Sequence, residues 1–384
     1  MINLTTEEKW TERQLEKLRE LVNNTNLTNK QIAISLNDMF NTNRTVNSIE
    51  HKMRNMLMTK PLNKNKDKDN SMDLIDDNRE LVVKYLKKNI FKGFPIEIAI
   101  GNNEKMHEEK SVLLLSDIHC GMINKIFDKN SSGELVTYNT LIRQKEMLYL
   151  RDSIAKIKTL LSNSFTLKHL YIFNLGDNIT NDRIFSGQIF HIESCVGLQV
   201  IEMARDLVFF INEMKKLYNK VTFVCIVGNH GRSTMDSNFD EPLENNYEFL
   251  MYKMIESVFE NDKNVEIIVP KSKFYIHRIY EHKYLLTHGD MIRGFSRSAI
   301  EKSIKDYVIS NESDFDVCCL GHFHRVDKMS LSEHNTTLIN GSWIKKDNYG
   351  FKVARQYSKP VQLFFGVSRR HAITWSFEID LQEV

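Results

Sequence analysis

Five short segments of this chain carry side chains of the kinds that bind divalent metal ions. Carboxylate, imidazole and amide groups offer oxygen and nitrogen donors, which suit manganese, iron or zinc better than a metal that prefers thiolates. The donors are numerous enough for two ions, so a dinuclear metal-dependent hydrolase is the first hypothesis. The five segments are Asp117-Ile118-His119, Gly176-Asp177-Asn178, Gly228-Asn229-His230, His288 in Thr-His-Gly-Asp, and His322-Phe323-His324.

Each segment ends or follows an apolar run that is typical of a β-strand, and amphipathic patterns between the runs predict helices. Open α/β sheets bind ligands just beyond the carboxyl ends of their strands, which is where the five segments would lie. We therefore expect an α/β fold built on two sheets. The expected strands are 111–116, 169–175, 221–227, 284–287, 317–320 and a strand-forming tail over 361–379; the expected helices are 140–161, 193–218, 244–259 and 296–309.

In this order, Asp-x-His, Gly-Asp, Gly-Asn-His, His and Gly-His-x-His resemble the motifs of the calcineurin-like metallophosphoesterase superfamily, over roughly residues 110 to 384. The resemblance implies a two-sheet αββα sandwich and a metal-bridging hydroxide that attacks phosphorus. It implies two divalent metal ions, with manganese as the first choice and iron or zinc as alternatives. By motif, Asp117, His119 and His324 would hold one ion, Asn229, His288 and His322 would hold the other, and Asp177 would bridge them.

The same resemblance makes His230 the expected general acid, which protonates the leaving oxygen. Many relatives carry an acidic residue directly after Gly-Asn-His, whereas Gly231 and Arg232 follow here. Arg232 could instead hold a phosphate oxygen bidentately. A second departure is the spacing between Asp177 and Asp182, which is longer than in the Gly-Asp-x-x-Asp-Arg-Gly pattern of the Ser/Thr phosphatases and argues against that branch.

Two further residues have more than one reading. His191 could line the substrate groove, but a residue at the start of a helix explains it as well. Asp290 could orient a ligand imidazole through a hydrogen bond, or could be an ordinary turn acid. A single histidine or a Gly-Asn pair is ordinarily a core or turn residue, so the metal site is inferred from the five motifs jointly.

The first part of the chain predicts three short helices over 6–58, with apolar residues at helical spacings. Thr28 and Gln31 form the pattern of a capping box, and Thr45 could cap the third helix. Together with Trp10, the starts of the second and third helices resemble Myb/SANT-like DNA-binding domains. The third helix would then enter the major groove and expose Asn47, Ser48, His51, Lys52, Arg54 and Asn55. A three-helix module that docks a protein is the alternative.

Length and pattern together predict three parts. A chain of 384 residues exceeds the usual size of one core. We expect a helix-turn-helix domain over 1–60, a connecting region over 61–109 and a metallophosphoesterase domain over 110–384. The polar stretch from Lys60 to Asp77 is typical of a flexible linker, and a short helical piece is expected near 79–88.

Composition excludes some classes of protein. Hydrophobic residues make up 41% and charged residues 27%, as in ordinary globular proteins. No apolar run approaches the roughly 20 residues of a membrane span, and no secretory segment is visible, so a cytoplasmic protein with no membrane partner is expected. The formal charge of +2 gives no global sign of nucleic-acid binding. The oligomeric state stays open.

The metal motifs determine a reaction type and not a substrate. A DNA-binding domain on a basic tether would raise the local concentration of nucleic acid, which favours a DNA phosphodiesterase or nuclease with DNA as its partner. The short tail after His324 fits a stand-alone enzyme of phage or mobile-element type. One alternative is a phosphomonoesterase or small-nucleotide phosphodiesterase whose helical domain binds a protein. A second alternative is a DNA-binding regulator that uses the fold as a scaffold.

Overall fold

The computed structural model describes residues 10–23, 27–42, 44–55, 107–128, 133–236, 241–310, 314–346 and 359–383. The chain divides into two compact units, Met1–Ile100 and Gly101–Val384, which we call the N-terminal unit and the C-terminal unit. The linker expected from Lys60 to Asp77 and the helical piece near 79–88 lie outside the described residues. Within the described ranges, no helix has the length and apolar character needed to cross a membrane.

The N-terminal unit contains three helices, α1 (Glu12–Asn23), α2 (Asn29–Phe40) and α3 (Val46–Asn55). The predicted capping box starts α2, since the backbone N–H of Gln31 donates to the Thr28 hydroxyl and the backbone N–H of Thr28 donates to the Gln31 side chain. One apolar face of each helix packs into a shared core. That core includes Leu18, Val22, Ile32, Leu36, Ile49 and Met53.

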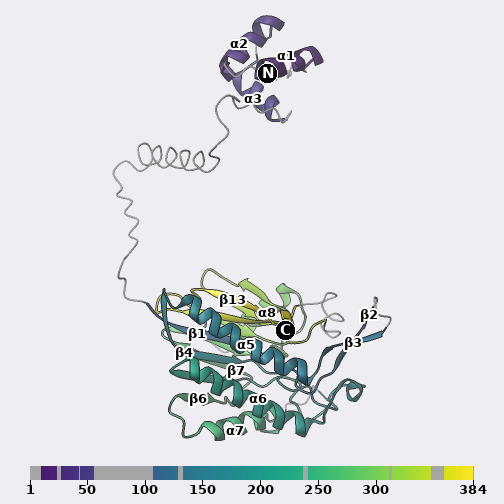
Figure 1. Ribbon diagram of the computed structural model, residues 1–384, viewed down its shortest axis with the longest axis vertical. Coiled ribbons are helices and arrows are strands. Elements are labelled where there is room, and N and C mark those ends of the chain that lie inside the picture. The colour runs from purple at the N-terminus through teal and green to yellow at the C-terminus, as the bar shows by residue number, and fades with distance from the viewer. Residues whose placement is uncertain are drawn as a thin grey trace, which may run out of the picture. The chain divides into compact units, whose positions relative to one another are not determined.

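The C-terminal unit is built on two sheets that pack face to face (Figure 1). In the first sheet the neighbouring strands are β13 (Ser376–Asp380), β12 (Val361–Val367), β1 (His107–Leu115), β4 (Phe165–Asn174), β5 (Lys220–Cys225) and β6 (Val265–Ile268). In the second they are β10 (Asp327–Ser330), β11 (Thr336–Ile339), β9 (Val317–Leu320), β8 (His282–Thr287) and β7 (Phe274–Ile279). Strands β1, β4, β5 and β6 are parallel, as are β8, β9 and β11.

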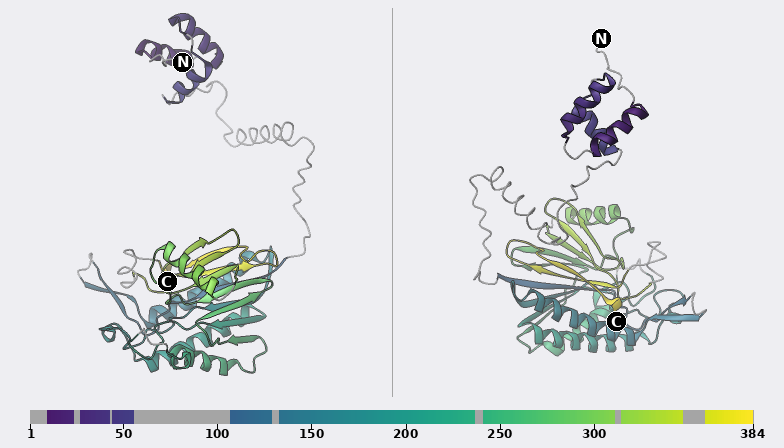
Figure 2. Two further views of the ribbon diagram at one scale, coloured as in Figure 1. Left: turned by 180° about the vertical axis from the view of Figure 1, so that it is seen from behind. Right: turned by 45° about the horizontal axis from the view of Figure 1, so that its top comes forward.

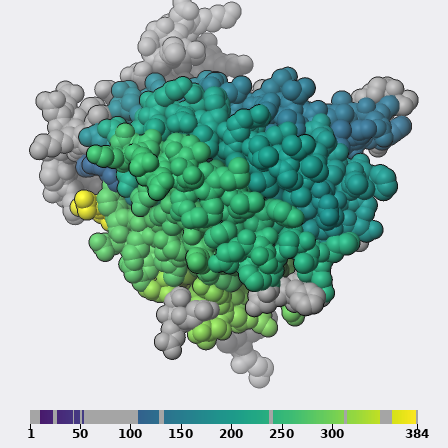
Figure 3. Space-filling model, turned by 90° about the horizontal axis from the view of Figure 1, so that it is seen from below, coloured from purple at the N-terminus to yellow at the C-terminus, as the bar shows by residue number. Residues whose placement is uncertain are grey.

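Helices cover the outer faces of both sheets. Helices α5 (Thr140–Leu161), α6 (Val196–Leu217) and α7 (Tyr247–Phe259) lie on the first sheet, and α8 (Arg297–Ser310) lies on the second (Figure 2). Short 3-10 turns are η1 (Gln188–His191), η2 (Leu243–Asn245) and η3 (Leu381–Glu383). A hairpin of β2 (Asn124–Asp128) and β3 (Gly133–Tyr138) stands out at one side of this unit (Figure 3).

Alternation along the strands explains the layers. Successive side chains of a strand point to opposite faces, so a strand buried on both faces can serve two cores. In β1, Leu113 packs beneath the helices and Leu114 packs between the sheets. In β9, Cys319 packs between the sheets and Cys318 packs beneath α8. The predicted αββα sandwich with a small three-helix unit is thereby confirmed.

Two histidines lie between the sheets, away from the carboxyl ends of the strands. The ring of His169 stacks on Tyr171 with centroids 4.1 Å apart, and the ring of His277 lies 5.4 Å from the same tyrosine. Burial lowers the pKa of each imidazole from 6.5 to about 4. The unfolded chain therefore takes up these protons near pH 6.5, and the folded chain only near pH 4.

We predict that this difference makes the protein lose stability as the pH falls from 6.5 to 4. In that interval the unfolded state binds more protons than the folded state, so the free energy of unfolding decreases with each step toward acid. The variant His277→Phe keeps an aromatic ring in an aromatic surrounding and removes one of the two groups. Its free energy of unfolding should fall less steeply, by up to about 1.4 kcal/mol per pH unit.

Urea unfolding of the metal-free protein at a series of pH values measures this slope. His334→Gln serves as the control, because His334 is exposed on the loop between β10 and β11. Its curve should follow that of the parent. Identical slopes for the parent and His277→Phe would show that this half-buried imidazole does not govern the acid stability.

Candidate metal centre

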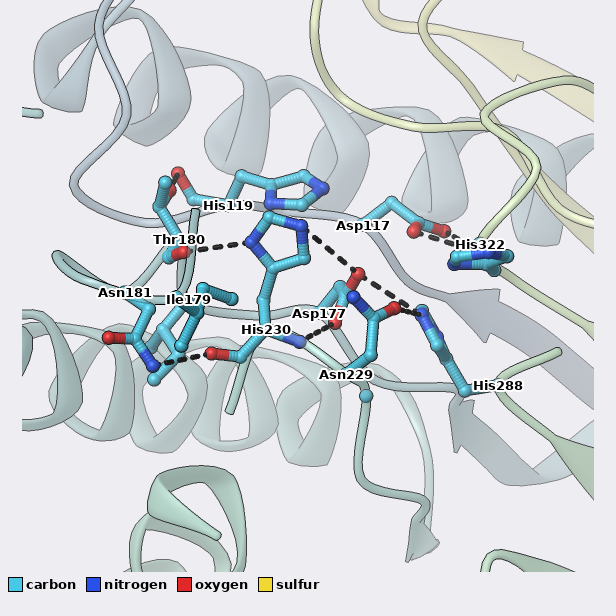
Figure 4. Close-up of polar contacts among 12 residues, drawn as sticks. Asp117, His119, Asp177, Ile179, Thr180, Asn181, Asn229, His230, His288 and His322 are labelled. Carbon is cyan, nitrogen blue, oxygen red and sulfur yellow. Dashed lines mark hydrogen bonds and ion pairs between the residues drawn. The ribbon is translucent and has the colours of Figure 1, made fainter. Parts of the chain in front are cut away.

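Five loops meet at the carboxyl ends of strands from both sheets, and every predicted metal ligand lies on one of them. Three of the loops follow β1, β4 and β5, and two follow β8 and β9. Most of these side chains point toward one another across this edge of the sheets (Figure 4). In chain order the residues are Asp117, His119, Asp177, Asn229, His288, His322 and His324.

The backbone is strained at five of these residues. The φ angle is 54° at Asp117, 51° at His119, 54° at Asp177, 66° at His322 and 51° at His324. A side chain other than glycine adopts such angles at a cost of about 1–3 kcal/mol each, and residues of this kind cluster at functional sites. The surrounding fold holds the loops in conformations that local sequence preference does not favour.

Two glycines let the loops after β4 and β5 approach each other. A Cβ atom added at Gly176, where φ is 88°, would lie 2.4 Å from the backbone nitrogen of Gly228. A Cβ atom added at Gly228 would lie 2.1 Å from Oδ1 of Asp177. Neither position has room for a side chain. The carboxylate of Asp177 is consequently held directly against the neighbouring loop.

The donor atoms form three overlapping clusters, and within each cluster they lie within 4.8 Å of one another. Two residues are shared between clusters: Asp177 and His119 each belong to two. This sharing puts Asp177 between the two predicted groups of ligands. The clusters are Asp117, His119 and His324; His119, Asp177 and His230; and Asp177, His288 and His322.

Contacts inside the clusters fit divalent cations. The Nε2 atoms of His119 and His324 lie 3.1 Å apart. Nε2 of His288 lies 3.0 Å from Oδ2 of Asp177 and 3.0 Å from Oδ1 of Asn229. Buried nitrogen and oxygen lone pairs that converge in this way are costly unless a positive charge compensates them. The donor set of imidazoles, carboxylates and an amide suits manganese, iron or zinc.

The two carboxylates are held in the ionised form that a metal requires. Burial alone would raise the pKa of Asp177, but the charges of His288 and His230 outweigh it and hold the pKa well below its usual range. For Asp117, burial is again opposed, here by the hydrogen bond and charge of His324, and the pKa is lowered. Both side chains are therefore anionic at neutral pH.

The imidazoles divide into two groups. Burial lowers the pKa of His119 to about 3 and that of His322 to about 4, so both rings are neutral and have lone pairs to offer. For His288, burial is outweighed by the charge of Asp177, and the pKa rises to about 10. Nδ1 of His288 lies 2.7 Å from the carbonyl oxygen of Leu175, which leaves Nε2 facing the centre. A cation at Nε2 would replace a proton there.

Glu248, on α7, connects the loops that carry Asp177 and Asn229, and the sequence patterns did not reveal it. Its carboxylate is fully buried and accepts hydrogen bonds from the backbone N–H groups of Asp177 (3.2 Å), Gly228 (2.6 Å) and Asn178. Burial and the nearby Asp177 raise the pKa of Glu248 to about 7. One side chain thus fixes the backbone on both sides of the Asp177 carboxylate.

The start of α7 also explains why glycine follows Gly-Asn-His. Asn246 caps the helix by accepting from the backbone N–H of Glu248, and its amide donates to the carbonyl oxygen of Gly228. A Cβ atom at Gly231 would lie 2.1 Å from Oδ1 of Asn246 and 2.8 Å from Cγ of Glu248. An acidic residue at position 231 has no room, because this first turn of α7 occupies the space.

The sequence pattern described as calcineurin-like phosphoesterase matches residues 110–326, more than half of the chain, and this interval contains all five ligand loops. The chain belongs to the calcineurin-like phosphoesterase family. Membership supports hydrolysis of a phosphoester with divalent metal ions. No curated protein matches the chain.

Solved structures with a similar fold are distant. Vps29 from Cryptosporidium parvum is 12% identical, with 68% of this chain and 86% of that chain covered and a TM-score of 0.30. Vps29 complexed with Zn²⁺ from Entamoeba histolytica is 10% identical over 71% and 99% of the two chains, with a TM-score of 0.30. A predicted phosphoesterase from Streptococcus pneumoniae is 10% identical over 70% and 98%, with a TM-score of 0.27. The family assignment rests on the match over residues 110–326.

In this calcineurin-like phosphoesterase site, His230 is held with one ring nitrogen toward the centre. Its Nδ1 lies 2.8 Å from the carbonyl oxygen of Thr180, and its backbone N–H donates to Asp177 over 2.8 Å. A carbonyl only accepts, so Nδ1 carries a hydrogen, and Nε2, 3.9 Å from Oδ2 of Asp177, is the nitrogen free to exchange a proton. The pKa of His230 is lowered by burial, which Asp177 opposes.

Arg232 has a different environment from the one expected. Its guanidinium donates to the backbone carbonyls of Asn229 (2.8 Å), Ile184 (3.1 Å) and Thr234 (3.1 Å) and lies 4.8 Å above the ring of Phe185. These bonds fasten the loop that carries Asn229. Bidentate binding of a phosphate group by Arg232 stays a prediction.

His191 and Asp290 are not members of the donor clusters. His191 is exposed on η1, and none of the three donor clusters includes it. Asp290 pairs with Lys273 at 3.2 Å. The group that orients His288 is therefore the carbonyl of Leu175 and not Asp290.

The residues predicted to contact DNA lie on α3 of the N-terminal unit. Asn47 is exposed, and Ser48 and Lys52 are half-buried. The ammonium group of Lys52 lies 5.9 Å from the ring centroid of Trp10. The side chains of the other three, His51, Arg54 and Asn55, lie outside the described part of the structure.

We predict that Glu248→Ala weakens metal binding. Three buried N–H groups would lose their acceptor, at a cost of about 1–3 kcal/mol each, and the two loops would separate. Residues that orient metal ligands typically contribute 10- to 100-fold to affinity or activity, so a loss of about that size is expected. Titration calorimetry with manganese measures the affinity directly.

Glu256→Gln is the matched control, because Glu256 lies on the same helix and pairs with Lys253 at the surface. Its affinity for manganese should equal that of the parent. If Glu248→Ala also kept the parent's affinity, the loops would be shown to hold their positions without this carboxylate.

Proposed function

We propose that the chain is a dinuclear metal-dependent phosphodiesterase that cleaves DNA. One observation carries the reaction type: Asp177 shares a donor cluster with His119 on one side and with His288 on the other. A carboxylate placed between two groups of ligands is typical of two-metal phosphoesterases.

The ligand set that we propose is the one implied by the motifs. Asp117, His119 and His324 would hold one cation, and Asn229, His288 and His322 the other, with Asp177 between them. Manganese is our first choice, with iron or zinc as alternatives. When bound, the cations supply Lewis-acid polarisation of a phosphoryl oxygen and a lowered pKa for water.

The proton at the leaving oxygen would come from His230. The Thr180 carbonyl fixes the ring so that Nε2 faces the donor clusters, where the scissile phosphate would bind. The imidazolium form, which the charge of Asp177 favours, gives its Nε2 proton to the oxygen whose bond to phosphorus breaks and becomes the neutral ring, so the alkoxide does not have to leave as an anion. Arg232 holds the same loop through three carbonyls, which keeps this nitrogen in place.

The N-terminal unit supports DNA as the substrate. Its third helix presents polar side chains, among them the exposed Asn47, and the basic Lys52 lies on the same helix. The guanidinium of Arg44 lies 4.1 Å above the ring of Trp10, so a second cation is fixed at the start of this helix. Phosphate contacts and base contacts from one short helix are the usual mode of a helix-turn-helix domain.

The test is cleavage of DNA by the intact chain. We predict strand scission with manganese and none with EDTA. The rate of scission should fall by more than about a hundredfold in Asp177→Asn, because the variant loses the anionic charge shared by both groups of ligands.

A second variant tests the N-terminal unit. Lys52→Glu should weaken DNA binding in a salt-dependent way and leave turnover of bis-(p-nitrophenyl) phosphate unchanged.

The same assay separates the competing functions. Turnover of p-nitrophenyl phosphate without DNA cleavage would replace the nuclease with a phosphomonoesterase whose helical unit binds a protein. DNA binding without any turnover in manganese would identify a regulator. Equal DNA affinity for the parent and Lys52→Glu would remove the argument from the N-terminal unit.

A separate prediction concerns His230. If it is the general acid, His230→Ala should slow the hydrolysis of DNA, whose leaving group is a poorly stabilised alkoxide, by about 10²- to 10⁴-fold. Bis-(p-nitrophenyl) phosphate has a leaving group that needs no proton, so its turnover should fall far less. An equal loss on both substrates would indicate that His230 serves only to shape the loop.

A further inference from the structure

The loop between Asp177 and α6 carries exposed apolar side chains beside the metal centre. Phe185 is 43% exposed, Ile189 65% and Phe190 82%. Single exposed apolar residues are ordinary, but three on one short loop at a catalytic edge indicate a contact surface.

Hydrogen bonds from a buried side chain fix the backbone of this loop, so the exposed side chains have defined positions. Gln188 is buried, and its side-chain oxygen accepts from the backbone N–H groups of Ile184 (2.9 Å) and Phe185 (3.2 Å). Its amide donates to the carbonyl oxygen of Thr180 over 2.6 Å. The backbone of the loop is thus tied to the same carbonyl group that orients His230.

Phe185 lies beside His230 and Arg232. Its ring centroid lies 5.1 Å from that of His230, and the guanidinium of Arg232 lies 4.8 Å from it. The guanidinium bonds to backbone carbonyls, which do not cancel its charge. A half-exposed aromatic ring with a cation beside it suits a flat aromatic group attached to an anion.

We infer that Phe185, with Arg232, forms a stacking subsite for an unpaired nucleobase on the leaving-group side of the scissile phosphate. This inference rests on the proposed function, because His230 would define the side on which the leaving oxygen lies. Every base has a π-face, and stacking on an aromatic side chain is independent of sequence. Phe190, on the same loop, is also exposed.

Stacking on a phenyl ring restricts the kind of DNA that is cleaved. A base inside a duplex is already covered by its neighbours on both faces, so it reaches the ring only if it is single-stranded or displaced. The substrate class is therefore DNA with an unpaired nucleotide at the cleavage site. An apolar side chain of a protein partner is the competing occupant.

The experiment uses the full chain and short single-stranded oligonucleotides in which one abasic site is moved along the strand. With the parent protein, kcat/KM should fall about tenfold when the abasic site adjoins the cleaved bond on the leaving side. Phe185→Ala should show the same fall on the normal strand and no further fall on that abasic strand. Phe185→Trp should restore cleavage, whereas Phe185→Leu, which keeps apolar volume without a flat ring, should not.

Phe209→Ala is the matched control, because Phe209 has a similar exposure of 45% and lies on α6 away from the loop. It should behave as the parent. Fluorescence anisotropy in EDTA gives a second readout, in which Phe185→Ala should bind the normal strand more weakly and the abasic strand as the parent does.

The outcomes separate the two proposals. Three outcomes would overturn the stacking subsite but not the proposed nuclease activity. DNA cleavage could be equal on normal and abasic strands, or equally fast on a fully paired duplex. Phe185→Ala could also lower cleavage of both strands to the same extent. Such a result would favour a protein partner at Phe185. Absence of any DNA cleavage would overturn the proposed function and the subsite with it.

Discussion

The close approach of the loops after β4 and β5 is the constraint on which the metal centre depends. Without Cβ atoms at Gly176 and Gly228 the two backbones meet, and the Asp177 carboxylate lies against the second loop. Such a contact buries backbone N–H groups that neither loop can satisfy alone. Glu248 accepts them, and the first turn of α7 is thereby required at this position. The absence of a side chain at Gly231 follows from the same packing.

The main strands, one long helix and the ligand loops could be predicted from the sequence, because burial leaves a clear pattern in it. Strands buried on both faces are continuous apolar runs, so β1, β4, β5, β8 and β9 were identifiable and their polar ends marked the ligand loops. The helix over Thr140–Leu161 was predicted with the bounds that it has. The order of the motifs alone indicates the family, and the match over residues 110–326 confirms it.

The parts that escaped prediction depend on contacts between distant segments. Strands β10 and β11 have four residues each and mix polar with apolar side chains, so neither shows a clear periodicity. Glu248 looks like an ordinary acid in the first turn of a helix, and only the fold brings it to the loops after β4 and β5. For Arg232 the sequence showed a charge near the site, but not the carbonyls that hold it. Positive φ angles at five ligand residues likewise arise from the assembled loops and not from residue preference.

The two substrate inferences constrain each other. A helix-turn-helix unit reads the major groove and therefore needs base-paired DNA, whereas a ring such as Phe185 can accept only a base that has left the duplex. A single base pair cannot meet both requirements. DNA that satisfies both has a paired segment next to an unpaired one, as at an overhang, a flap or a melted site. Under these two proposals the N-terminal unit would select where the enzyme is concentrated, and the loop beside His230 would select which bond is exposed to the metal centre.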